Sequence, residues 1–202
     1  MSGCRQAMRA LGTGAMSLAV LVLTGCVSPA GDDTARASGN RSLLRVMSFN
    51  IEWGGAHVRF ESVVEAIRAA GADVVGVQEP EGNLERLAND LGWYHNRRNH
   101  VVSKFPLVDP PGGGQYVFVE IAPGSVVAIA NVHLPSDPYG VDWLRDGRAP
   151  DDVMALERNV RLPKIEPLLG RLAALYRRGI PVFLTGDFNS PSDADWTSAA
   201  IG

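Results

Sequence analysis

The sequence predicts a mixed α/β (α+β) fold, and three patterns support that class. Two apolar runs flank an amphipathic helical segment over residues 60–70, which is the order of a β-α-β unit. Short apolar segments separated by Pro and Gly follow between residues 99 and 132, as in an antiparallel meander. A long helical pattern over residues 151–178 then precedes the last apolar run, residues 182–185.

The composition fits an ordinary soluble globular domain. Of the 202 residues, 46% are hydrophobic and 20% are charged, and the formal net charge is -3. These values exclude a disordered or collagen-like chain. They also argue against a broadly basic nucleic-acid-binding surface, while leaving room for a local basic patch.

The N-terminal segment resembles an export signal. Arg5 and Arg9 precede an apolar stretch that closes on Leu23-Thr-Gly-Cys26, which is similar to the lipobox of bacterial lipoproteins. We therefore predict a lipoprotein signal peptide over residues 1–25 and lipid attachment at Cys26. The protein would be exported and anchored by lipid to the outer face of the bacterial membrane. A plain secretory signal with an incidental cysteine is the alternative.

A polar tether over residues 26–41 and a folded domain over residues 42–202 would follow the signal. The other cysteine, Cys4, would leave with the signal peptide. The folded domain would then have no thiol for a disulfide or a zinc–thiolate site.

The β-α-β unit places polar side chains at two strand ends. Asn50 follows the first apolar run, and Glu79 follows the second. Because ligands of such sheets bind beyond the carboxyl ends of the strands, both lie where a site is expected. Each is, taken singly, as readily a helix cap or a solvated loop residue. The predicted elements are strands over residues 43–50 and 73–79 and helices over residues 60–70 and 83–91.

The meander and the helix after it add a third strand end. The predicted strand over residues 126–132 runs out as Asn131-Val-His133, and alternation places Asn131 and His133 on one face. Residues 135–150 read as a polar surface loop. The helix over residues 151–178 is expected to be capped by Asp151 or Asp152 and broken or kinked midway by its prolines. Its predicted core stripe and breaking prolines are Met154, Val160, Pro163, Ile165, Pro167, Leu168, Leu172 and Leu175.

The last strand runs into Gly186-Asp-Phe-Asn189. Alternation turns Asp187 and Asn189 to the same side. The segment by itself is either an Asx-type turn closing a strand or part of a site for a cation, a water or a phosphate. Four strand ends therefore carry amide, carboxylate and imidazole groups, a set suited to a hard cation and to phosphoester hydrolysis.

Five short motifs, taken in order, resemble the endonuclease/exonuclease/phosphatase superfamily, whose members include DNase I-like nucleases. The resemblance covers about residues 44–196. It implies a four-layer sandwich of two mixed β-sheets flanked by helices, with the C-terminal part missing. The motifs are Ser48-Phe-Asn-Ile51, Val77-Gln-Glu79, Ser103-Lys-Phe-Pro106, Asn131-Val-His-Leu134 and Gly186-Asp-Phe-Asn-Ser-Pro191.

The resemblance implies a role for each strand-end residue. Glu79 would be the main ligand of Mg²⁺, with Mn²⁺ or Ca²⁺ as alternatives, and Asn50 would assist directly or through the phosphate. His133 would bind a phosphate oxygen or protonate the leaving group, and Asp187 would orient or activate the attacking water. Asn189 would hold the phosphate. Asn131 would either support these groups or simply form a strand-end hydrogen bond.

The same resemblance implies a C-terminal Asp-His pair, which the sequence lacks before Gly202. We therefore expect an N-terminal fragment or truncated product with weak or no catalysis. The alternative function is a non-catalytic surface lipoprotein that retains the fold as a ligand- or metal-binding remnant. For the enzyme, the expected substrate is a nucleic acid, a phospholipid headgroup or a small phosphodiester, and a monomer is expected.

Overall fold

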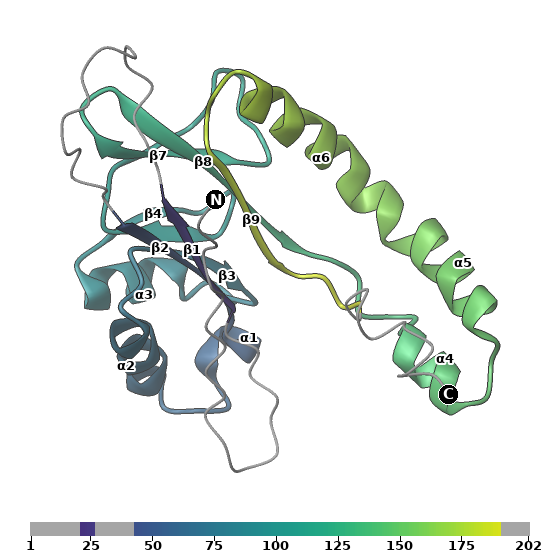
Figure 1. The fold of residues 1–202 in the computed structure, drawn as a ribbon. Coiled ribbons are helices and arrows are strands. Elements are labelled where there is room, and N and C mark those ends of the chain that lie inside the picture. The colour runs from purple at the N-terminus through teal and green to yellow at the C-terminus, as the bar shows by residue number, and fades with distance from the viewer. Residues whose placement is uncertain (1–20, 27–42, 191–202) are drawn as a thin grey trace.

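The computed structural model describes residues 21–26 and 43–190, and its fold is a four-layer sandwich (Figure 1). Two mixed β-sheets pack face to face, and helices cover the outer face of each sheet. The predicted fold class, a sandwich of two mixed β-sheets flanked by helices, is confirmed. The covering helices are α2 (Phe60–Ala70) and α3 (Leu84–Leu91) on the first sheet and α6 (Leu162–Arg177) on the second.

The first sheet has five strands in the order β1-β2-β3-β5-β4. Strands β2 and β3 are parallel and joined through α2, which is the predicted β-α-β unit. The other neighbours in this sheet are antiparallel. The strands are β1 (Leu21–Cys26), β2 (Leu43–Asn50), β3 (Val74–Gln78), β4 (Tyr94–Asn96) and β5 (Val101–Ser103).

The second sheet has the order β6-β7-β8-β9, with β8 and β9 parallel and the remaining pairs antiparallel. The predicted meander is thus divided between the two sheets, because β5 joins the first one. Within the described residues, β9 is an edge strand. The strands are β6 (Leu107–Val108), β7 (Val117–Ala122), β8 (Ser125–His133) and β9 (Val182–Asp187).

Three apolar layers hold the sandwich together. One lies between the first sheet and helices α2 and α3, and includes the fully buried Met47 and Ile67. The second lies between the sheets, where Val46 and Val74 face Val127 and its neighbours. The third lies between the second sheet and α6. Burial of these side chains is the main favourable contribution to folding.

The segment between β8 and β9 differs from its prediction in three ways. The expected loop contains a helix, α4 (Gly140–Arg145). The expected helical segment is divided into two helices, α5 (Pro150–Val160) and α6, and this confirms the break predicted at its prolines. The helix α5 begins after Ala149 without a side-chain cap, so capping by Asp151 or Asp152 was a wrong prediction. Val153 and Leu156 are buried instead of Met154 and Val160, whereas the apolar stripe predicted for α6 is confirmed.

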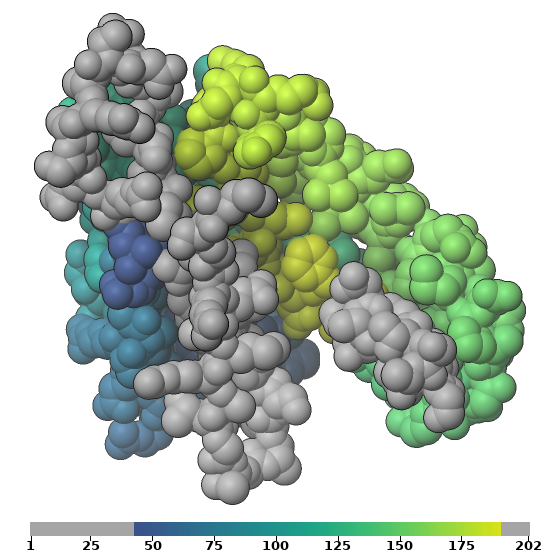
Figure 2. Space-filling view, in the orientation of Figure 1, coloured from purple at the N-terminus to yellow at the C-terminus, as the bar shows by residue number. Residues whose placement is uncertain are grey.

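The break between α5 and α6 falls at Arg161, just before Pro163. The Arg161 side chain is 3% exposed and donates to Glu157 and to the carbonyl of Pro138. It therefore ties the loop after β8 to the helix junction. Helices α4, α5 and α6 form one ridge along the side of the molecule (Figures 1 and 2). None of the described helices is both long and apolar enough to cross a membrane.

Strand β1 coincides with the end of the predicted signal peptide. Its six residues pair antiparallel with β2, so that Cys26 lies opposite Leu43. The signal peptide and the lipid attachment stay predictions, since nothing in the fold tests cleavage. The predicted tether and the last residues of the predicted domain lie outside the described residues.

Candidate active site

The space between the two sheets changes from apolar to polar toward the carboxyl ends of the parallel strands. Along β2, Val46, Ser48 and Asn50 alternate onto this inner face. Val46 belongs to the apolar core, Ser48 bonds to the backbone of Gly186 in β9, and Asn50 reaches Asp187 at the end of β9. The inner face thus has three successive levels, and the candidate site is the outermost.

The middle level is a buried layer of hydrogen-bonded polar side chains, which we call the buried polar layer: Ser48, Gln78, Asn131 and Thr185. The Asn131 Oδ1 accepts from Gln78 and, at 3.0 Å, from Thr185. Its Nδ2 donates to the carbonyl of Val77 at 2.9 Å and to that of His100 at 3.3 Å. Gln78 is 2% exposed and Thr185 3%. Asn131 therefore joins the two sheets behind the site, and its side chain is not directed to Glu79.

Gly76 makes the buried polar layer possible. A Cβ atom at this position would lie 2.0 Å from Thr185 Oγ1 and 2.6 Å from Asn131 Oδ1. Only a residue without a side chain lets polar groups of the second sheet approach the backbone of β3 this closely.

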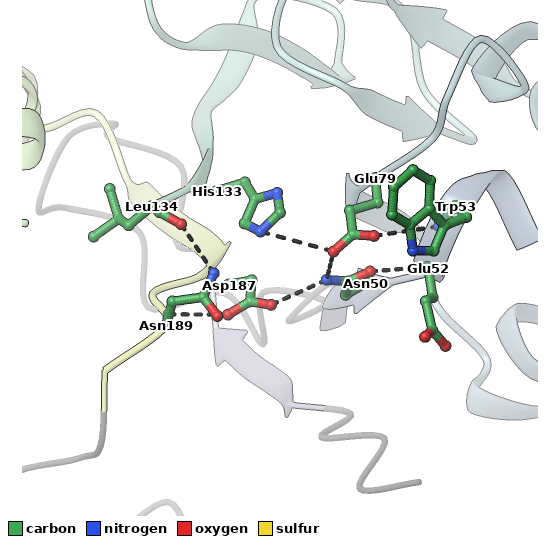
Figure 3. Close-up of polar contacts among 8 residues, drawn as sticks. All are labelled: Asn50, Glu52, Trp53, Glu79, His133, Leu134, Asp187 and Asn189. Atoms are coloured by element: carbon green, nitrogen blue, oxygen red, sulfur yellow. Dashed lines mark hydrogen bonds and ion pairs between the residues drawn. The ribbon is translucent and has the colours of Figure 1, made fainter. Parts of the chain in front are cut away.

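The outermost level, which we call the open cluster, consists of Asn50, Glu79, His133 and Asp187 (Figure 3). The amide Nδ2 of Asn50 donates to Glu79 Oε1 at 2.8 Å and to Asp187 Oδ2 at 3.0 Å. One neutral amide nitrogen thus holds two carboxylates beside each other. The Asn50 Oδ1 accepts from the backbone nitrogen of Glu52 at 2.8 Å, which fixes the orientation of the amide.

His133 enters the open cluster through strand register. It is the last residue of β8 and lies opposite Asp187 in the parallel β8–β9 pair. Its Nε2 lies 3.8 Å from Glu79 Oε1. The side chain is 38% exposed, so it can meet both a ligand and the carboxylates.

Asn189 lies at the margin of the open cluster. Its backbone nitrogen donates to Asp187 Oδ1 at 3.0 Å, and its side-chain Nδ2 donates to the carbonyl of Leu134 at 2.9 Å. The first bond is the Asx-type turn anticipated from the sequence. The turn uses Asp187 Oδ1 and leaves Oδ2 directed at Asn50. Asp187 therefore ends its strand with one oxygen and faces the site with the other.

A strained turn holds Glu79. The segment α1 (Glu52–Gly55) has left-handed backbone at Glu52, at Trp53 and at Gly54, and the backbone nitrogen of Trp53 donates to Glu79 Oε2 at 3.2 Å. Glu79 itself has a φ of 53°. Left-handed backbone costs a non-glycine residue about 1–2 kcal/mol, and such residues concentrate at functional sites.

A pocket of about 610 Å³ opens beside the open cluster. Its wall includes Glu79 and His133, together with Trp53, whose side chain is 63% exposed. Four of its non-glycine lining residues have left-handed backbone, which no pattern in the sequence indicated. These four are Trp53, Glu79, Glu81 and His100.

The structure therefore brings together four of the predicted site residues, Asn50, Glu79, His133 and Asp187, from four different strand ends. It assigns Asn131 to the buried polar layer and Asn189 to the turn. Sequence reasoning missed Trp53 as a pocket residue and Gln78 as the centre of the buried polar layer. A polar side chain at an inward position of an apolar strand was the available signal for Gln78.

Comparison with known proteins places these features in a family. A family model described as "Endonuclease/Exonuclease/phosphatase family" matches residues 47–200. An uncharacterized protein of Caenorhabditis elegans is 30% identical over 182 residues, which cover 76% of this chain and 56% of the relative. The chain thus spans little more than half the length of that relative. No solved structure matches significantly. Since the family model takes in most of the chain and all four strand ends, the chain belongs to the endonuclease/exonuclease/phosphatase family, whose members hydrolyse phosphoester bonds.

Proposed function

We propose that the open cluster is the active site of a phosphoester hydrolase that depends on a divalent metal ion. The observation that carries the proposal is the pair of carboxylates, Glu79 and Asp187, held at one amide nitrogen of Asn50. Within the described residues, neither carboxylate forms an ion pair with Lys or Arg, and the charged contact of this pair is that between Glu79 and His133. Two like charges in this arrangement favour a bound cation.

The oxygen groups of the open cluster fit a hard cation such as Mg²⁺, with Mn²⁺ or Ca²⁺ as alternatives. Nowhere in residues 21–26 and 43–190 are three Asp, Glu, His or Cys side chains grouped to hold a metal by themselves. Glu79 would therefore be the principal protein ligand. This agrees with the usual coordination of Mg²⁺ in proteins, in which one or two carboxylates are joined by waters and by phosphate oxygens of the substrate. When bound, the ion would polarise the phosphate and neutralise developing charge.

Asp187 and His133 would manage the protons of hydrolysis. Asp187 is oriented at both oxygens, by the backbone of Asn189 and by the amide of Asn50, and would take a proton from the attacking water. As the water oxygen bonds to phosphorus, the bond to the leaving oxygen breaks. His133, whose Nε2 lies 3.8 Å from Glu79 Oε1, would donate a proton or a hydrogen bond to that oxygen (Figure 3).

The amides would act in different ways. Asn50 presents its nitrogen to the carboxylates while its oxygen is held by the backbone of Glu52, so we propose that it orients Glu79 and Asp187. Asn189 would support the turn that aims Asp187, since its side chain already bonds to Leu134. Asn131 would act only through the buried polar layer.

The test is hydrolysis of bis(p-nitrophenyl) phosphate by the purified chain with increasing Mg²⁺, followed by chelation with EDTA. We expect slow metal-dependent release of p-nitrophenol, in line with the weak catalysis predicted from the sequence, and Glu79→Gln should reduce it by about 10²-fold or more. The matched control is Glu85→Gln, which removes the same charge from an exposed position in α3. Equal activity in Glu79→Gln and Glu85→Gln would contradict the assignment.

The same hydrolysis assay can identify the substrate class. Parallel reactions with DNA, RNA, phospholipids and small phosphodiesters would rank the candidates by kcat/KM. p-Nitrophenyl phosphate, added as a monoester, would separate phosphodiesterase from phosphatase activity.

We also propose that the protein is exported and carries lipid at Cys26. Support comes from the Leu23-Thr-Gly-Cys26 sequence. Because Cys26 pairs with Leu43 at the sheet edge, cleavage before it would require β1 to leave β2. Metabolic labelling with a palmitate analogue tests this: the label should appear in the wild type and be absent from Cys26→Ser. Labelling of both proteins, or of neither, would contradict the proposal.

A further inference from the structure

A second groove adjoins the open cluster and has a basic lining. Its volume is about 910 Å³, and it lies between the glycine-rich loop 112–114 and helix α6. His133 lines this groove as well as the pocket beside Glu79, so the two adjoin at His133. The groove is lined by Arg98, Lys164 and Arg171, and its lining includes no Asp or Glu.

The three cations of the groove lack carboxylate partners. Within the described part of the chain, none of them forms an ion pair, whereas Arg86, Lys104, Arg145 and Arg161 all do. The chain as a whole has a formal net charge of -3, so the positive charge of the groove is opposite in sign to the net charge of the chain. Unpaired cations gathered in a groove attract anions more strongly than cations already neutralised by neighbours.

Helix α6 presents two of these cations on one stripe. Lys164, Leu168 and Arg171 are spaced at i, i+4 and i+7, and all three line the groove. Leu168 is 1% exposed and packs on the second sheet. The buried leucine thus fixes the face of the helix on which the two cations stand.

The third cation is held from the opposite wall. A Cβ atom on Gly113 would lie 1.9 Å from Arg98 Nη1, so the guanidinium rests directly on the glycine loop. The neighbouring Asn99 is 6% exposed and bonds to the carbonyl of Tyr116 at 3.2 Å, which anchors the turn that carries Arg98. Arg98 is therefore placed by packing, although its side chain meets solvent.

We propose that this groove binds a second phosphate group of the substrate while the scissile phosphate lies at the open cluster. The inference rests on the proposed function and deepens it, because it selects substrates with more than one phosphate. Arginine offers paired donors that match phosphate oxygens, and lysine adds a point charge. The second phosphate comes either from the next link of a nucleic acid strand or from a small polyphosphorylated molecule.

The experiment measures binding to the full chain in EDTA, so that its result does not depend on hydrolysis. A fluorescein-labelled short oligothymidylate is titrated by anisotropy, and inositol hexakisphosphate is used as a competitor. Removal of two phosphate-binding arginines, Arg98→Ala with Arg171→Ala, should weaken binding of the tighter ligand by about 10-fold or more. For the oligonucleotide, the slope of log K against log salt should fall by about 0.7 for each cation lost. Preference for one ligand identifies the source of the phosphate.

The matched control is Arg97→Ala with Arg177→Ala, which removes the same charge from outside the groove. Its affinity should stay close to that of the wild type. A second pair avoids charge altogether: Gly113→Ala displaces Arg98, whereas Gly112→Ala has a similar left-handed backbone but no atom within 4 Å of the added Cβ. Only Gly113→Ala should weaken binding.

Two outcomes would contradict the proposal that the groove binds a second phosphate. One is equal loss of affinity in the groove variant and its control, and the other is a wild-type chain that binds neither ligand. Hydrolysis of bis(p-nitrophenyl) phosphate, which carries one phosphate, is measured separately. Absence of that hydrolysis with groove binding intact would contradict the proposed function and leave the second phosphate site supported.

Discussion

The buried polar layer and the open cluster are adjacent levels of the same strand ends, yet they differ in how completely their groups are bonded. In the buried polar layer, Asn131 uses both ends of its amide and Gln78 donates to acceptors from both sheets. In the open cluster, Glu79 and Asp187 share one amide nitrogen and have no Lys or Arg partner within the described residues.

This difference distinguishes the polar groups that stabilise the fold from those that can bind a ligand. Buried polar groups are tolerated when each is hydrogen-bonded, because an unpaired one costs about 1–3 kcal/mol. Neighbouring carboxylates repel each other and gain from a cation that the protein does not supply. The buried polar layer therefore holds the sheets together, and the open cluster is where we propose that substrate and metal bind.

The largest expected effect tests the open cluster. Asp187→Asn keeps an oxygen for the Asx turn but removes the charge that would accept a proton. We expect kcat to fall by about 10²–10⁴-fold. The free energy of unfolding should change little, since relief of the repulsion with Glu79 offsets loss of the hydrogen bond that Asn50 donates to Asp187 Oδ2. Activity assays and urea unfolding measure the two quantities, and a loss of stability without a loss of activity would reverse the comparison.

The next effect tests the close packing of the buried polar layer against Gly76. In Gly76→Ala the added methyl would collide with Thr185 and Asn131, so we expect a loss of stability of about 3 kcal/mol. Gly170→Ala is the matched control, because it lies in α6 with no atom within 4 Å of the new Cβ. It should stabilise the protein by about 0.5–1 kcal/mol. Equal unfolding midpoints for the two variants would show that the side chains of Thr185 and Asn131 do not pack closely against the backbone at Gly76.

A smaller effect decides the role of Asn131, which the sequence left open. Asn131→Ala removes the acceptor that Gln78 and Thr185 share and the donor to the carbonyls of Val77 and His100. We expect a loss of about 1–3 kcal/mol in the free energy of unfolding. Its kcat should fall far less than that of Asp187→Asn. If instead activity fell as strongly and stability did not change, Asn131 would belong to the open cluster.

The smallest effect concerns pH. Desolvation lowers the pKa of His100 from its ordinary value of 6.5, against a weaker opposing effect of Glu81. The unfolded state then binds more protons than the folded state, so stability should decrease as the pH falls through 6.5. His100→Asn, which tolerates the left-handed backbone at this position, should make the decrease shallower in thermal melts. An unchanged pH profile would remove His100 as a contributor.

Much of the fold was accessible from periodicity. Apolar runs and helical stripes predicted the β-α-β unit and the stripe of α6, because alternation and the helical repeat are local properties. The prolines also predicted a break in the helical segment, but the helix α4 and the position of the break at Arg161 were not accessible. They depend on a buried arginine that bonds to a carbonyl more than twenty residues earlier in the chain, a contact that local sequence does not encode.

The candidate site was divided in the same way. The sequence by itself determined which side chains stand at the strand ends, since residue type and strand alternation suffice for Asn50, Glu79, His133 and Asp187. Only the tertiary structure decided that Asn131 turns into the buried polar layer and that Glu79 is held on left-handed backbone. It also decided that Arg98 meets helix α6 across a groove. The physical reason is that register, sheet-on-sheet packing and glycine clearances join residues far apart in the chain, and no local pattern records these contacts.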